Sequence, residues 1–337
     1  MEDERVPLVL YLKDFANKGV QDNPKKKVID LIPKWNQVFG FVAIDASLED
    51  LREIIDSLEA LLEDDKCPVF VAHKAAANGA LKLLQIFLDE GWFDFNARQH
   101  SDANRETPLH IACEHGRTEV VKLIILASKE HGIDLNAKDE LFGQTPFLVA
   151  CHHGNTEIMK LFIDSSEEYG IDLTCSTKAF YLHKSAFHLV CENGPIEAVE
   201  LLIKSSKRYK IDLNKTDYSG DTAFQNACEN TQFDENIDIV KLMLKSSKEY
   251  GIDVNRQYPD SHDTCFHHII SNSNAELAKF MIENHQEFGL DITSKNDCKE
   301  TGLDLIKEQI ETFGRTNFVE VKNLLESETK SNCCSIL

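Results

Sequence analysis

Apolar residues recur at three- and four-residue spacings along most of the chain, and each such run predicts a helix with one buried face. Residues 120–125 carry one apolar stripe, and residues 48–62 carry an earlier one. Ser47 and Asp50 resemble a capping box at the start of the earlier run, with Asp in place of the usual Glu. The hydrophobic pattern therefore predicts short amphipathic helices through most of the chain.

A short phrase recurs in front of these helices. It reads ETPLHIACEHG over residues 106–116, QTPFLVACHHG over 144–154, KSAFHLVCENG over 184–194 and DTAFQNAC from 221 onward. A repeat at a nearly fixed period indicates a stack of similar units rather than one globular core. Stacks of this kind usually bind other proteins and usually lack chemistry of their own.

The register of the phrase can be followed along the chain, at spacings of 37, 38, 40, 37, 42 and 37 residues. Its histidine position is occupied in turn by His73, His110, Leu148, His188, Gln225, His267 and Asp304. A second phrase, such as SKEHGIDLN over 128–136, closes each unit. The glycine of the first phrase and the aspartate of the second are 18 residues apart in the middle units but 15 apart in the first unit. The middle units therefore carry about one extra helical turn at the end of their second helix.

The first phrase resembles the ankyrin repeat, whose T-P-L-H-x-A signature is followed by a glycine and a second helix. Thr107 is suited to cap the first helix, and Pro108 fits the first helical position because its missing N–H is not needed there. Gly116 is placed to end that helix in a left-handed conformation. The resemblance covers residues 67–325, with a period longer than the usual value of about 33. It implies an all-α solenoid of six or seven helix-turn-helix units with connecting β-hairpin loops.

We expect three regions along the chain. Residues 1–66 form a helical N-terminal cap or a small docking region, and residues 327–337 form a disordered tail that begins in the polar segment 326–332. The region between them, 67–326, holds the repeats at about 67–101, 102–140, 141–180, 181–217, 218–258, 259–296 and 297–326, the last being a degenerate cap.

In the ankyrin family the hairpin tips project to one side and often contact the partner. Irregular loops among regular ones are where specificity is expected. These are the connections 96–107 and 174–185 and the insertion 232–235. The resemblance thus implies partner contacts on hairpins and inner-helix ends, at Arg98, His100, Arg105, His115, Lys138, Asp139, His152, His153, Phe180, Tyr181, Asp217, Tyr218, Arg256 and Tyr258.

Two columns of the second phrase have both a structural and a functional interpretation. We expect the aromatic column to pack the longer helix ends against each other, and a ladder for a ligand is the alternative; its members are Tyr169, Tyr209 and Tyr250. The hairpin asparagines resemble sites that an asparaginyl hydroxylase often modifies in ankyrin proteins; they are Asn136, Asn214 and Asn255. A turn asparagine that bonds its own backbone needs no enzyme, and we favour that interpretation.

The net charge of −21, from 36 basic and 57 acidic residues, argues against binding to a nucleic-acid backbone. The charge is compatible with a basic protein partner, although a well-solvated surface is the simpler explanation. Ten cysteines without a secretory signal predict reduced thiols in the cytosol. Those that follow the repeat are expected to be small core residues; they are Cys113, Cys151, Cys191 and Cys228.

Four common motifs of catalysis and metal binding do not occur in the sequence. There is no C-x-x-C pair, H-E-x-x-H, phosphate-cradling glycine loop or G-x-S-x-G elbow. We therefore expect a monomeric protein without enzymatic activity, cofactor or metal. Its predicted function is that of a protein-interaction scaffold or adaptor.

The last residues read Cys333-Cys334-Ser335-Ile336-Leu337. The final four match the C-a-a-X prenylation box, and a terminal Leu favours geranylgeranyl on Cys334. One prenyl chain binds membranes only reversibly, and palmitoylation of Cys333 would supply a second anchor. The sequence therefore predicts a prenyltransferase among the partners and a lipid anchor on the cytoplasmic face of a membrane.

Two other functions remain compatible with the sequence. The first is a soluble inhibitor resembling the acidic ankyrin inhibitors of Rel-family transcription factors, which mask basic segments. The second is a substrate adaptor that docks through residues 1–66. Affinity that falls steeply with salt would favour the inhibitor, because charge would dominate its binding.

Overall fold

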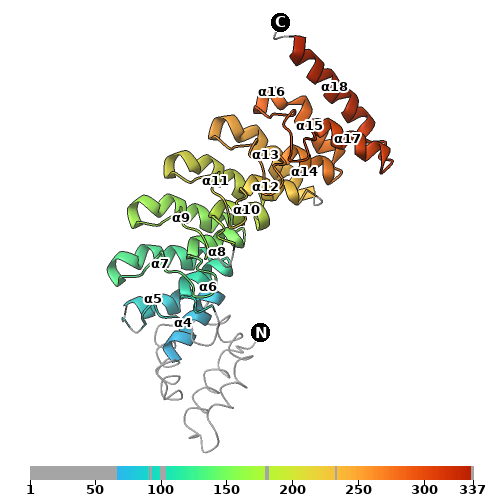
Figure 1. Ribbon diagram of the computed structural model, residues 1–337. Helices are drawn as coiled ribbons and strands as arrows, with labels where there is room; N and C mark the ends of the chain where they lie inside the picture. The colour runs from blue at the N-terminus through green and yellow to red at the C-terminus, as the bar shows by residue number, and fades with distance from the viewer. Residues whose placement is uncertain are drawn as a thin grey trace, which may run out of the picture. The chain divides into compact units, whose positions relative to one another are not determined.

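The computed structural model describes residues 67–89, 91, 93–98, 104–178, 182–231 and 234–334. The regular elements in these ranges are α-helices (Figure 1), and isolated bridges such as that between Thr216 and Thr222 mark the hairpin connections. The prediction of an all-α repeat fold is confirmed. The helix expected over 48–62 lies outside the described residues. The described chain divides into two compact units, one of residues 67–150 and 157–172, the other of residues 151–156 and 173–334.

The first unit alternates inner and outer helices. The inner helix α4 (Cys67–Asn78) packs on α6 (Pro108–Glu114), and the outer helix α5 (Leu81–Asp89) packs on α7 (Thr118–His131). Most of α8 (Pro146–His152) and nearly all of α9 (Thr156–Tyr169) complete this unit, and the ring centroids of Phe147 and Phe162 lie 6.0 Å apart. The apolar stripe predicted over 120–125 is buried at four of its five apolar positions.

The second unit continues the same alternation. Its inner helices pack in the order α10 (Ala186–Asn193), α12 (Ala223–Glu229), α14 (Cys265–Ser271) and α17 (Gly302–Glu311). Its outer helices are α11 (Ile196–Tyr209), α13 (Asp234–Tyr250), α15 (Ala275–Glu283), the short α16 (His285–Phe288) and α18 (Phe318–Cys334). The repeat cysteines are buried, as predicted.

The outer helices of the middle repeats are longer than the first, as the phrase spacing predicts. Helices α7, α9 and α11 have 14 residues each, against nine in α5. A residue with positive φ follows each of the three, and it is glycine after α7 and α9 but Lys210, with φ 55°, after α11. A left-handed backbone costs a non-glycine residue about 1 kcal/mol, so the stop at Lys210 is strained.

The tyrosines near these helix ends link successive outer helices. The ammonium group of Lys129 lies 4.6 Å from the ring centroid of Tyr169, and that of Lys207 lies 4.9 Å from the ring of Tyr250. A cation over an aromatic face is attracted by the ring quadrupole, by roughly 0.5–1 kcal/mol at exposed sites. Lysine–tyrosine pairs therefore join the helix end of α7 to that of α9, and that of α11 to that of α13.

Buried histidines tie four of the inner helices, α4, α6, α10 and α14, to the next hairpin. The Nδ1 of His110 accepts the N–H of Thr107 at 3.3 Å, and Nε2 lies 3.0 Å from the carbonyl oxygen of Gln144. Because Nδ1 is the acceptor, Nε2 carries the proton and donates to that carbonyl. The same Nε2 contact links the other histidines of the column to residues 33 positions further on, in the pairs His73–Glu106, His188–Asp221 and His267–Glu300.

A column of asparagines links successive hairpins. The Nδ2 of Asn136 donates to the carbonyl of Gly170 at 2.8 Å, and its Oδ1 accepts the N–H of Asp172 at 2.8 Å. The same two bonds are made by Asn96, Asn214 and Asn255. The prediction that these side chains bond their own backbone is wrong, because their amides bond the following repeat.

Two segments differ from the sequence prediction. Residues 326–332 are not a disordered tail, because α18 continues through them to Cys334. The start of that helix is anchored by buried Phe318, Val321 and Leu325, and the polar segment beyond contains good helix formers. In the insertion 232–235, the last two residues belong to α13 and the first two lie outside the described residues. Within the described ranges, no helix has the length and apolarity to cross a bilayer.

Candidate protein-binding surface

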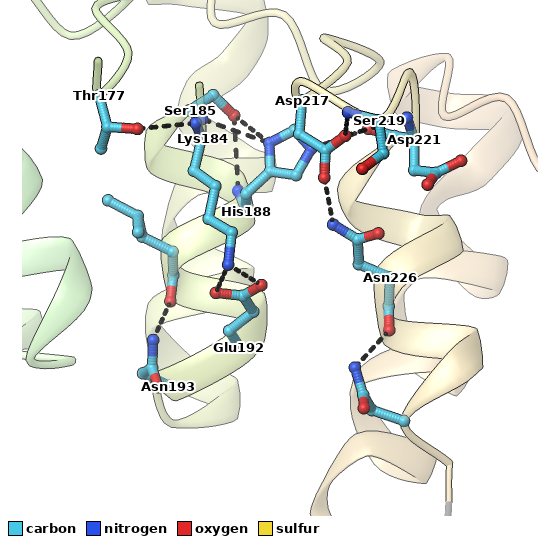
Figure 2. A network of polar contacts seen from close by, with 12 residues as sticks. Thr177, Lys184, Ser185, His188, Glu192, Asn193, Asp217, Ser219, Asp221 and Asn226 are labelled. Carbon is cyan, nitrogen blue, oxygen red and sulfur yellow. Dashed lines mark hydrogen bonds and ion pairs between the residues drawn. The ribbon is translucent and has the colours of Figure 1, made fainter. Parts of the chain in front are cut away.

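The hairpin before α12 shows how a tip of the second unit is built. The Oδ1 of Asp217 accepts the backbone N–H groups of Ser219 at 2.8 Å and Asp221 at 3.2 Å. Its Oδ2 accepts the side-chain amide of Asn226 on α12 at 3.0 Å (Figure 2). One carboxylate thus binds three donors, and it fixes the tip to the helix that follows.

Adjacent tips expose two apolar side chains. The N–H of Tyr218 donates to the carbonyl of Leu182 on the preceding tip at 2.8 Å. Leu182 is 44% exposed and Tyr218 is 72% exposed, the highest value for a large apolar side chain among the described residues. Leu182 and His183 both have positive φ, 60° and 52°. Each of these conformations costs a non-glycine residue of the order of 1–3 kcal/mol.

Carboxylates gather beside these tips. The pKa of Asp221 is raised by burial and by the neighbouring Asp217 and Asp260, while Arg256 acts in the opposite direction. The pKa of Glu229, at the end of α12, is raised by burial and by Asp221 and Asp217. Carboxylates that raise one another's pKa lie close together, so negative charge is concentrated here. In the described part of the chain, the Oδ1 of Asp221 is buried without a hydrogen-bond partner.

A lysine and a glutamate on the preceding repeat compensate each other. The Nζ of Lys184 lies 2.5 and 2.6 Å from the two carboxylate oxygens of Glu192 (Figure 2). The two side chains are 14% and 26% exposed, and the backbone N–H of Lys184 donates to the hydroxyl of Thr177 at 2.9 Å. Because this pair is internally neutral, the excess of negative charge lies on the next repeat, with Asp221 before the start of α12 and Glu229 at its end.

In the first unit, several predicted partner contacts instead hold the hairpins together. The Nη1 of Arg98 donates to the carbonyls of Arg105 at 3.0 Å and Lys138 at 2.6 Å. Asp139 is buried and accepts three backbone N–H groups within its own turn. The prediction of a partner contact is therefore wrong for Asp139, whereas His115 and Lys138 are exposed.

In the second unit, one predicted contact is buried. Tyr258 is 5% exposed, its hydroxyl donates to the carbonyl of Gln225 at 2.7 Å, and its ring lies 4.1 Å from that of His268. Tyr258 occupies the hairpin position that Asp217 holds in the preceding repeat, and it turns inward to close the core. The prediction of a partner contact is therefore wrong for Tyr258.

The remaining predicted residues divide by accessibility. The exposed ones are His153, Tyr218 and Arg256, and the half-buried ones are Arg105, His152 and Asp217. Burial and the neighbouring His153 lower the pKa of His152. Cys333 and Cys334 are the last residues of α18. Three predicted contacts lie outside the described residues, namely His100, Phe180 and Tyr181.

Three residues of this surface were not predicted from the sequence, namely Leu182, Asp221 and Glu229. Asp221 stands directly before a helix cap, where the other repeats have Glu106, Gln144, Lys184, Asp263 and Glu300. Four of the six residues at this position are acidic, so the sequence gives no signal that sets Asp221 apart. The exposure of Leu182 depends on its left-handed backbone, which the sequence does not signal.

A stack of helical hairpins with exposed tips defines a protein-interaction scaffold. Models of ankyrin repeats match residues 43–139 and 167–258 (three-copy model) and residues 124–163 (many-copy model), and the chain belongs to the ankyrin-repeat family. The crystal structure of the ankyrin repeat domain of Bcl-3, a member of the IkappaB protein family, is similar, with a TM-score of 0.57. That likeness has 24% identity, covers 76% of this chain and 97% of the Bcl-3 chain, and shows the fold alone. No curated protein sequence matches the chain.

Proposed function

We propose that this chain is a non-catalytic adaptor that binds a protein partner through the hairpin tips of its second unit. The observation that carries the proposal is the pair of adjacent tips at which Leu182 and Tyr218 are exposed. Exposed apolar side chains that neighbour each other favour an interaction site, whereas scattered ones need no explanation. Conserving the fold does not require these two side chains to be apolar, because each projects away from the core of its repeat.

Affinity capture tests this proposal. The wild-type chain and a Leu182→Ser/Tyr218→Ser variant would be used as baits in a lysate of the source organism. We expect the variant to lose a specific protein that the wild type recovers. Leu126→Ser is the matched control, because it removes a leucine that is 59% exposed on the outer helix α7. Recovery of the same proteins in the same amounts by all three baits would contradict the proposed surface.

The adaptor would be held on the cytoplasmic face of a membrane by lipids on the C-terminal cysteines. The C-a-a-X match over 334–337 supports a geranylgeranyl group on Cys334, added by a prenyltransferase, and Cys333 is the acceptor for palmitate. The test is the intact mass of the protein from cells, combined with membrane fractionation of wild type and Cys334→Ser. A Cys334→Ser protein that stays with membranes as fully as the wild type does would refute the anchor.

A second candidate function is a soluble acidic inhibitor that masks a basic partner. It is supported by the net charge of −21 and by the fold likeness to the ankyrin domain of an IkappaB family member. For this function, affinity for the captured partner should fall steeply between low and moderate salt, and the chain should carry no lipid. A partner whose affinity is insensitive to salt would exclude this second function.

A further inference from the structure

Resting on the proposed protein-binding function, we propose that the second unit recognises a basic linear segment of its partner. An apolar side chain of that segment covers Leu182 and Tyr218, and a lysine or arginine reaches Asp221 and Glu229. We call these four residues the tip surface.

The apolar half of the tip surface is defined by two exposed side chains on neighbouring tips. A backbone bond joins Tyr218 to Leu182, and their side chains are 72% and 44% exposed. Covering a large apolar side chain removes surface from water at roughly 25 cal/mol per Å². Tyrosine is also a frequent anchor in interfaces, because it offers much contact area with few rotatable bonds.

The tip surface is held rigidly before any partner arrives. Asp217 binds the backbone of its own tip and the Asn226 amide on α12, so the turn that carries Tyr218 is fixed. A Cβ on Gly220 would lie 2.9 Å from Pro259 Cγ, so the next tip packs closely against this one. A rigid surface loses little conformational entropy on binding, which favours recognition of a flexible segment.

The carboxylates select the charge of the occupant. Asp221 and Glu229 lie close enough to Asp217, and Asp221 close enough to Asp260, for their charges to oppose one another, and Arg256 partly compensates the charge at Asp221. A cationic side chain of the partner would offset this mutual repulsion. An acidic segment would add to the repulsion.

The net charge of the chain disfavours the other occupants of such a surface. A second copy of this chain would bring another −21 of charge to the interface, and a nucleic acid would bring phosphates. Only a segment with positive charge gains from both halves of the tip surface. The occupant is therefore a basic segment with at least one large apolar residue.

A selection from a displayed random library of twelve-residue peptides tests the inference on the full-length chain. Recovered peptides would be synthesised, and their affinities measured by fluorescence polarisation at about 50 and about 300 mM salt. We expect them to carry lysine or arginine together with an aromatic or large aliphatic residue. Tyr218→Ser should weaken binding by about tenfold or more. Glu229→Gln and Asp221→Asn should each weaken binding at low salt and flatten its salt dependence.

Two matched controls lie outside the tip surface. Phe313→Ser removes an apolar side chain that is 57% exposed, and Glu283→Gln removes an exposed carboxylate on α15. Both should leave the affinity within about twofold of wild type, since surface changes away from a site have small effects. Because Glu229 is exposed at a helix end, Glu229→Gln remains informative even if Asp221→Asn unfolds.

Three results would overturn the inference. They are a selection that yields no peptide above background, recovered peptides that lack basic residues, and equal affinity for wild type and Tyr218→Ser. Loss of capture with Tyr218→Ser, together with recovered peptides that lack basic residues, would leave the adaptor function standing and refute the basic segment. The two proposals therefore fail separately.

Discussion

Acidification should weaken the stack through His110, and one substitution isolates the effect. His110 is fully buried, and burial lowers its pKa from 6.5 to about 4, against the smaller opposing influence of the Gln144 carbonyl. Its Nδ1 accepts the N–H of Thr107, and a proton on that nitrogen would break this bond. The folded protein therefore holds this imidazole neutral at pH 7.

The magnitude follows from the two pKa values. In the unfolded chain a histidine has a pKa near 6.5, so between that value and about 4 the unfolded state binds a proton that the folded state does not. The stability that depends on neutral His110 is complete above pH 6.5 and is lost as the pH falls through 4. Linkage between proton binding and folding lowers the free energy of unfolding, relative to its value above pH 6.5, by about 2 kcal/mol at pH 5 and by about 3 kcal/mol at the acid limit.

His110→Gln is the matched variant, because Gln225 occupies the same repeat position and its Oε1 accepts the N–H of Thr222 at 3.0 Å. Glutamine does not titrate, and the other histidines are common to both proteins. Urea unfolding at pH 7.5 should show the variant less stable by about 1 kcal/mol, for the lost bond to Gln144. At pH 5 the wild type should have lost about 2 kcal/mol more of its unfolding free energy than the variant, so that the gap closes or reverses. Equal changes in the two proteins between these pH values would refute the reasoning.

Four further substitutions give expected outcomes in urea or thermal unfolding. Asn136→Ala removes both bonds to the following repeat and should destabilise by about 1–3 kcal/mol, whereas Asn193→Ala at an exposed helix end should have little effect. Lys210→Gly should stabilise by about 1 kcal/mol, because glycine adopts the left-handed stop without strain; a loss of stability would contradict this. Gly302→Ala should destabilise by about 1–3 kcal/mol, because a Cβ there would lie 2.4 Å from Phe266 Cε1, and an unchanged melting temperature would show that the core yields. Tyr258→Phe should cost about 1 kcal/mol and leave partner capture unchanged, whereas lost capture at full stability would place Tyr258 in the interface.

Much of the fold follows from the sequence because the repeat imposes the same physical requirements many times. The capping threonine, the histidine three residues later and the glycine stop each answer a local need of a short helix, so their spacing alone predicts α6 and its relatives. The extra turn of α7 and α9 could likewise be predicted. The glycine and the aspartate of these units are 18 residues apart, against 15 in the first unit, and the three additional residues extend the helix.

The candidate site could be predicted only in part, because exposure depends on tertiary packing. Asp217 and Tyr258 hold the same hairpin position, yet the first fixes a tip and the second is buried against Gln225 and His268. Asp139 stands in a polar loop, which predicts an accessible side chain, but its carboxylate accepts backbone N–H groups of its own turn. The same types of polar residue bond the protein's own backbone and contact partners, so the sequence does not distinguish the two roles.

The asparagine column also affects where in the protein deamidation occurs. Deamidation requires the backbone nitrogen of the next residue to reach the side-chain carbonyl carbon. In Asn136 and its equivalents both amide atoms are held by the following repeat, so that approach is blocked while the stack is closed. Asn193 is exposed and is followed by Gly194, whose lack of a side chain removes the steric barrier to attack. Spontaneous damage in stored protein should therefore begin at an inner-helix end, with the asparagine column the last to change.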